Sequence, residues 1–98
     1  MYFSVRRVRG PAWDAARGMR EQGNWAGHAA FMDGLAAEGF IVLGGPVGPG
    51  DKEFLFENYS ESEEVLRARL AADPWSESDL LEIAHIEPWT ILLDSRRP

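Results

Sequence analysis

The sequence predicts a small α+β domain whose strands and helices follow one another as two β-α-β units. Two observations predict it: short segments alternate apolar and polar residues with a period of two, and two longer segments place apolar residues at helical spacing. The chain has 98 residues and no Pro/Gly/Ser-rich spacer between its apolar segments. We therefore expect one domain over residues 1–98.

The first unit begins with a strand over Tyr2–Arg9, in which Phe3 and Val5 share one face and Gly10-Pro11 ends the alternation. A helix is predicted from about residue 25 to 38 and closed by Gly39. An additional helical turn between Trp13 and Glu21 is kept as an alternative. The apolar stripe of the helix contains Trp25, His28, Phe31, Met32 and Leu35.

The second unit begins with a short strand over Phe40–Leu43, ended by Gly44-Gly45-Pro46, and continues with a strand over Glu53–Tyr59. The intervening Gly48-Pro49-Gly50-Asp51 predicts a hairpin loop. Ser60 and Glu63 have the spacing of a capping box, which predicts a helix over about 61–72.

Asp73-Pro74 is expected to stop the second helix, because proline disfavours helical geometry in the residue before it. The last strand is predicted from Leu81 to Leu93, with a break or edge position at Pro88. The resulting order, βαββαβ, is that of a ferredoxin-like fold: a four-stranded antiparallel sheet with two main helices on one face.

The other face of such a sheet stays open unless a partner covers it. Phe40–Leu43 is apolar at every position, which predicts burial on both faces. A second copy packed sheet against sheet would provide that cover. We therefore expect a homodimer, and regard an open-faced monomer as the alternative.

Composition limits the other partners and the compartment. The net charge is -6, and Lys52 is the only lysine, so a nucleic-acid or anionic-membrane surface is not expected. No apolar run approaches the roughly 20 residues of a membrane-spanning helix. The absence of cysteine excludes disulfides and, with no export signal recognised, predicts a cytoplasmic protein.

Two residues could carry acid–base chemistry. His28 lies on the apolar stripe of its helix, and spacing alone favours a buried structural histidine, although imidazole is also the commonest general base. Asp73 follows the second helix, where the helix dipole disfavours a carboxylate. It either belongs to an Asp-Pro turn or accepts the ring N–H of His28.

Other constellations are weaker. The stretch Gly44–Gly50 lacks the Gly-Lys-Ser/Thr ending of a phosphate loop and is followed by a strand, so it predicts a tight turn that lets a substrate or partner approach the backbone. A metal site using His28 and His85 matches no ligand spacing, and we expect neither metal nor cofactor. Trp75 and Trp89 could form pocket walls or dimer contacts.

Four segments together resemble the YCII-related (YciI-like) family in order and spacing. They are His28-Ala29-Ala30-Phe31-Met32, Gly39-Phe40-Ile41-Val42-Leu43-Gly44-Gly45-Pro46, Ala72-Asp73-Pro74-Trp75 and Ile86-Glu87-Pro88-Trp89. The resemblance implies a dimeric α+β barrel and an active site with one His and one Asp, which match His28 and Asp73, while Gly45 and Pro46 match the family's Gly-Pro. One branch of the family resembles a chlorohydroxyhydroquinone dehydrochlorinase. The chain departs from the shorter family pattern by an insertion over Gly10–Asn24, which could line or cover the pocket.

The resemblance, with His28 and Asp73 in matching segments, implies a cofactor-independent lyase or isomerase acting on a small cyclic or aromatic compound, in which Asp73 orients His28. Apolar pocket walls are expected from Trp25, Phe31, Trp75 and Trp89. The alternatives are a non-catalytic ligand-binding or regulatory homodimer, and an interaction module without a pocket. The separation of His28 and Asp73 in space distinguishes them.

Overall fold

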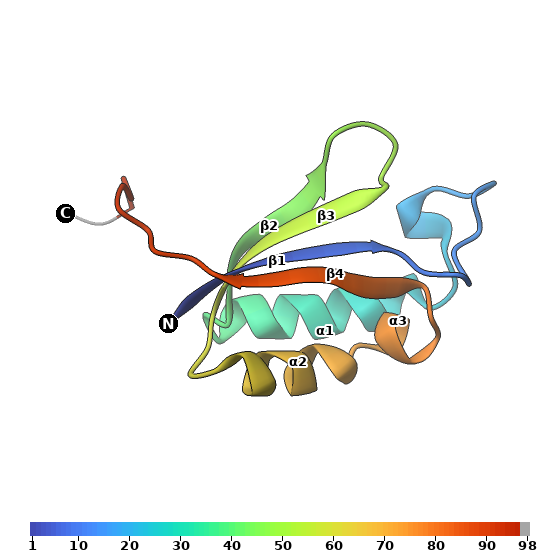
Figure 1. Ribbon diagram of the computed structural model, residues 1–98. Helices are drawn as coiled ribbons and strands as arrows, with labels where there is room; N and C mark the ends of the chain where they lie inside the picture. The colour runs from blue at the N-terminus through green and yellow to red at the C-terminus, as the bar shows by residue number, and fades with distance from the viewer. Residues whose placement is uncertain (97–98) are drawn as a thin grey trace.

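A computed structural model describes residues 1–96, and these form an antiparallel four-stranded sheet in the order β2-β3-β1-β4 with helices on one face (Figure 1). The fold confirms the predicted ferredoxin-like α+β class. In chain order the elements are β1 (Tyr2–Arg9), the 3-10 turn η1 (Met19–Glu21), α1 (Trp25–Ala37), β2 (Ile41–Val47), β3 (Glu53–Tyr59), α2 (Glu63–Ala71), α3 (Pro74–Glu77) and β4 (Leu81–Pro88).

The core lies between the sheet and the helices. On β1 the side chains of Phe3, Val5 and Arg7 are buried, whereas those between them are half-buried on the open face. Leu66 and Leu70 of α2 and Leu35 of α1 pack on the same core. Each large apolar side chain buried here stabilises the fold by about 1.5–3 kcal/mol.

Helix α1 begins and ends on local signals. The Asn24 side chain accepts a hydrogen bond of 3.2 Å from the Gly27 amide, which satisfies a free N–H of the first turn. The helix is followed by Gly39 at φ 79°, a conformation that a Cβ would strain. The Phe40 amide then returns to the Leu35 carbonyl, which places β2 beside the helix.

The structure corrects three boundaries of the second half. Ser62, not Ser60, caps α2, and its hydroxyl accepts from the Val65 amide at 3.1 Å. Asp73-Pro74 ends one helix but also begins another, because proline suits the first turn of α3. Strand β4 ends at Pro88 rather than at Leu93, since the proline cannot continue the ladder.

Strand β2 is longer and less buried than predicted. It runs on through Gly44-Gly45-Pro46 to Val47, which an edge strand permits. Within the single chain Val42 and Leu43 are 38% and 51% exposed, so the expected burial of this strand on both faces is not realised by one copy. Register places Leu43 opposite Glu57, on the face away from the helices.

The insertion between β1 and α1 is a packed loop and not a helix; only η1 within it is helical. The buried Gln22 side chain ties it together by donating to the carbonyls of Asp14 and Arg17 at 2.8 and 3.0 Å. Trp13 enters the core and meets the Trp75 ring edge-on at 5.7 Å. The loop thus reaches the end of the sheet where β1 ends and β4 begins.

Candidate active site

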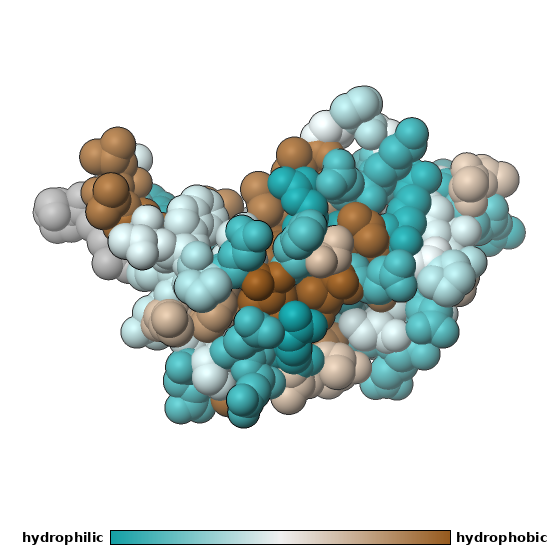
Figure 2. All heavy atoms as spheres, viewed as in Figure 1, coloured by the Kyte–Doolittle hydropathy of each residue, from teal (hydrophilic) through white to brown (hydrophobic). Residues whose placement is uncertain are grey.

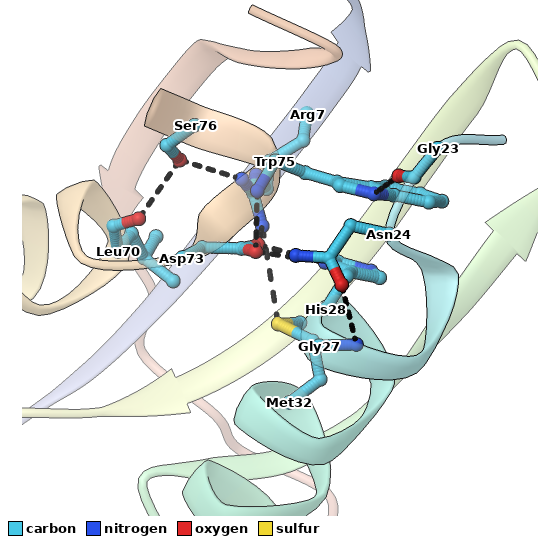
Figure 3. Close-up of polar contacts among 10 residues, drawn as sticks. All are labelled: Arg7, Gly23, Asn24, Gly27, His28, Met32, Leu70, Asp73, Trp75 and Ser76. Carbon is cyan, nitrogen blue, oxygen red and sulfur yellow. Dashed lines mark hydrogen bonds and ion pairs between the residues drawn. The ribbon is translucent and has the colours of Figure 1, made fainter. Parts of the chain in front are cut away.

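His28, Asp73 and Arg7 meet at one buried point, although each belongs to a different part of the fold (Figure 3). His28 lies in the first turn of α1, Asp73 caps α3, and Arg7 comes up from β1. His28 Nδ1 is 2.9 Å from both carboxylate oxygens of Asp73. Arg7 Nη1 donates to Oδ2 at 2.8 Å.

The Asp73 carboxylate is the centre of this cluster. Its Oδ1 also accepts the Trp75 amide at 2.9 Å, which is the cap of α3. Burial alone would raise the pKa of Asp73, but the hydrogen bonds from His28 and Trp75 together with the charge of Arg7 outweigh burial and hold the pKa below its usual range. Asp73 is therefore an anion at neutral pH.

An ionised carboxylate only accepts hydrogen bonds, so the nitrogen facing Asp73 must carry a proton. In neutral His28 this places the hydrogen on Nδ1 and leaves the lone pair on Nε2. No group within residues 1–96 hydrogen-bonds Nε2. The pair has the geometry of a base held in one tautomer by an acid.

Two tryptophans fix the plane of the His28 ring. Trp75 stacks on it with centroids 3.9 Å apart and an interplanar angle of 4°, as Figure 3 shows from the side. Trp75 is itself buried, and its indole N–H donates to the Gly23 carbonyl at 2.8 Å. Trp25 lies 5.8 Å from the imidazole at a tilt of 49°. The imidazole is therefore confined to a single orientation.

A cavity of about 200 Å³ adjoins this histidine. It lies between α1, the loop with η1 and strands β2 and β3, and the side chain of His28 is 10% exposed at its wall. Apart from His28 the lining is uncharged and nearly all apolar, as small-molecule sites usually are. The other lining residues are Met19, Trp25, Met32, Gly44, Gly45, Pro46, Phe54, Phe56, Trp75 and Leu81.

Two larger hollows flank the cavity but hold neither His28 nor Asp73. One of about 310 Å³ lies between α1 and β2, and one of about 480 Å³ lies between η1 and the β2–β3 loop. We place the candidate site in the smaller cavity because it alone among the three is lined by His28.

Of the predicted wall residues, Trp25, Trp75, Gly45 and Pro46 line the cavity and two others do not. Phe31 is half-buried against the core instead. Trp89 follows Pro88, which pairs with Phe3, whereas Leu81 at the cavity pairs with Arg9. Trp89 therefore lies at the opposite end of the sheet.

His85 also lies away from His28. It pairs with Arg6, whose side chain points to the open face. Among residues 1–96 no three His, Asp or Glu side chains gather in a way that could hold a metal ion. In the same range no helix has the length and apolarity needed to cross a membrane.

The sequence did not indicate Arg7, Met19, Met32, Phe54, Phe56 or Leu81 as residues of the site. Arg7 carried a readable signal: it follows Phe3 and Val5 in the alternation and so falls on the apolar face of its strand. The sequence does not tell which carboxylate neutralises a buried arginine. Met19 belongs to the insertion over Gly10–Asn24, which was expected to line or cover the pocket. It is the one residue of that segment that lines the cavity.

The fold and the site together define a small ferredoxin-like α+β protein with a His–Asp pair beside an apolar cavity. No family model and no curated protein sequence matches the chain. A solved structure does: 5-chloro-2-hydroxyhydroquinone dehydrochlorinase (TftG) from Burkholderia phenoliruptrix AC1100, in complex with 2,5-dihydroxybenzoquinone. The two are 24% identical over 92% of this chain and 94% of that one, with a TM-score of 0.69. This likeness establishes the shared fold.

Proposed function

We propose that the chain is a cofactor-independent enzyme of the lyase or isomerase type that acts on a small cyclic or aromatic compound, and that it belongs to the YCII-related family. The observation that carries the proposal is the 2.9 Å contact between His28 Nδ1 and Asp73 at the wall of a cavity. An apolar cavity of about 150 Å³ already accommodates benzene. A volume of about 200 Å³ therefore suits one substituted ring.

The chemistry assigned to the site is a proton transfer at Nε2. His28 takes a proton from a hydroxyl or carbon of the ring, and the freed electron pair moves into the ring. In a lyase a leaving group then departs with its bonding pair; in an isomerase the imidazolium returns the proton at another atom. Asp73 stabilises the imidazolium and keeps Nδ1 protonated throughout. The solved neighbour is named for a hydroxylated ring compound and holds another one, and this supports the proposed substrate class.

A panel assay tests the proposal. The parent chain is incubated in D₂O with single-ring hydroxylated compounds, some of them halogenated, and product formation and deuterium uptake are followed by NMR. We expect turnover that falls about 10²–10⁴-fold in His28→Gln. His85→Gln is the matched control and should keep the parent rate. Binding without turnover in the parent chain would contradict the enzyme and favour a non-catalytic ligand-binding homodimer.

We also propose that the protein is a cytoplasmic homodimer that packs through the open face of the sheet. Leu43, Val47 and Tyr59 are 41–53% exposed in one copy and lie on the same open face of the sheet. Figure 2 shows the surface hollowed between the β2–β3 hairpin and the C-terminal tail, whose Leu92 and Leu93 are 86% and 93% exposed. A second copy would cover these groups, and a chain of this size gains stability from such cover.

A further inference from the structure

Arg7 is a buried cation that binds the Asp73 carboxylate of the proposed site. Its side chain has no exposed surface, and neither has that of Asp73. Within residues 1–96 no other carboxylate pairs with it. A buried charge is costly unless it is paired and hydrogen-bonded, so Arg7 and Asp73 depend on each other.

The contacts of Arg7 orient the Asp73 carboxylate and also neutralise its charge. While Nη1 donates to Asp73 Oδ2, Nη2 donates to the Ser76 hydroxyl at 2.8 Å, and that hydroxyl donates to the Leu70 carbonyl at 2.8 Å (Figure 3). The planar guanidinium therefore connects β1 to the last turn of α2 and to α3. Donors from α1, β1 and α3 converge on a single carboxylate.

We propose that Arg7 is a positioning residue of the site: it fixes the orientation of the Asp73 carboxylate and limits how strongly that carboxylate attracts the proton on His28. The inference rests on the proposed function and goes beyond it by assigning a third residue. Without Arg7 the carboxylate would be an uncompensated anion, and the imidazolium of His28 would be more stable. Fewer molecules would then carry the free Nε2 lone pair that the proposed proton transfer needs.

Of the groups around His28 within residues 1–96, Arg7 is the one whose charge offsets that of Asp73. Strands β2 and β3 contribute only uncharged residues to the cavity, α3 contributes Trp75, and the cap of α3 places Asp73 against His28. The loop contributes Arg20, whose guanidinium lies 5.8 Å from the Trp25 ring centroid and forms no ion pair within residues 1–96.

The test is an NMR titration of the His28 ring in the parent chain, Arg7→Met and the matched control Arg6→Met. Arg6 neighbours Arg7 but lies on the open face, ion-paired with Glu53. We expect Arg7→Met to move the titration midpoint up by about one pH unit and Arg6→Met to leave it unchanged. With an active substrate, the acid limb of the kcat/KM profile should move by the same amount.

If Arg7→Met does not fold, the titration midpoint, kcat and KM are measured for Arg7→Lys instead. It keeps the charge but loses the planar fork, so the midpoint should stay near the parent value while kcat falls about tenfold or more with KM little changed. A folded Arg7→Met with the parent midpoint, or an Arg7→Lys with the parent kcat, overturns the inference. The titration needs no substrate: a shifted midpoint in a chain that turns over nothing would remove the enzyme proposal and keep the role of Arg7.

Discussion

At the scale of single residues, Asp73 joins stability to the proposed chemistry. Its carboxylate compensates Arg7, caps α3 and holds the His28 ring, and none of its side-chain surface is exposed. Such a group cannot be altered for one task without affecting the others. Function and folding are therefore expected to respond together to changes at this position.

Asp73→Asn should destabilise the fold by about 3–5 kcal/mol, because it leaves Arg7 buried without a counter-charge. Urea unfolding followed by tryptophan fluorescence measures the loss. Asp33→Asn is the matched control: Asp33 is exposed on α1, and its loss should change the free energy of unfolding by no more than about 0.5 kcal/mol. Equal unfolding midpoints for the two variants would show that Arg7 and Asp73 do not stabilise each other.

The lowered pKa of Asp73 also predicts a pH dependence. The folded pKa lies below the unfolded value of about 3.9, so the folded state is favoured by ionisation. Its contribution is fully present above that value and is lost as the pH falls through the folded pKa. Below about pH 4 the parent chain should thus lose stability more steeply than Asp73→Asn, as measured by urea unfolding at several pH values. Parallel curves would contradict this origin of the acid sensitivity.

His28 and Asp73 could be named as site residues because their segments resemble the YCII-related family; the helical stripe and the Asp-Pro turn alone favoured or allowed structural roles. Their contact could not be predicted from that spacing, since 45 residues separate them and the distance depends on how α1 and α3 pack. Trp89 does not line the cavity of one chain, because it follows the end of β4 opposite to Leu81; its alternative role as a dimer contact stays a prediction.

At the scale of elements, the glycines of edge strand β2 shape the cavity because they have no Cβ. A Cβ on Gly44 would come within 2.2 Å of the Phe56 ring, whereas a Cβ on Gly45 would meet nothing within 4 Å. Alternation along the strand turns the two positions to opposite faces. Gly44 thus lets the aromatic ring of β3 pack directly against the edge strand.

Gly44→Ala should destabilise the fold by about 1–3 kcal/mol through overpacking against Phe56. Gly45→Ala is the matched variant, with no clash and no positive φ, and should change stability by less than about 1 kcal/mol. Thermal unfolding of the two variants side by side decides the matter. A Gly44→Ala as stable as Gly45→Ala would mean that Phe56 does not pack as described.

The inserted loop depends on Gln22. Gln22→Ala removes the bonds to the carbonyls of Asp14 and Arg17 and should cost about 1–3 kcal/mol. Hydrogen exchange should increase mainly within residues 10–24, while Arg17→Ala, at an exposed side chain, should leave exchange close to that of the parent chain. Unchanged protection in Gln22→Ala would show that Trp13 alone holds the loop.

The strands and both main helices were predictable because their periodicity is intrinsic to the sequence. The cap of α2 and the existence of α3 were not, since Ser60 and Ser62 both offer a hydroxyl and an Asp-Pro pair serves equally to end a helix or to begin one. The packing of Trp75 against His28 of α1 favours the formation of α3.

At the scale of the whole molecule, one face of the sheet carries the helices and the site, and no helix of residues 1–96 covers the other, which the C-terminal tail reaches where Arg96 pairs with Glu57 (Figure 1). The sequence indicated the need for cover through the apolar run at Phe40–Leu43, and the exposure of Leu43 in one copy agrees with that need. In the proposed homodimer a second copy covers this face.

The proposed homodimer predicts that the parent chain has twice the monomer mass by light scattering. Leu43→Lys should shift it towards monomer, because a charge would be buried at the interface without a partner. Glu64→Gln changes the net charge by the same amount on exposed α2 and should remain dimeric. A monomeric parent chain at the concentrations tested would contradict the dimer.

The central claim is that Asp73 holds His28 with the proton on Nδ1 and the lone pair of Nε2 free at the cavity. NMR of the ¹⁵N-labelled histidine ring, recorded where the ring is neutral, reads the tautomer directly. We expect a protonated Nδ1, an unprotonated Nε2, and loss of this preference in Asp73→Asn. A ring protonated on Nε2 in the parent chain would contradict it.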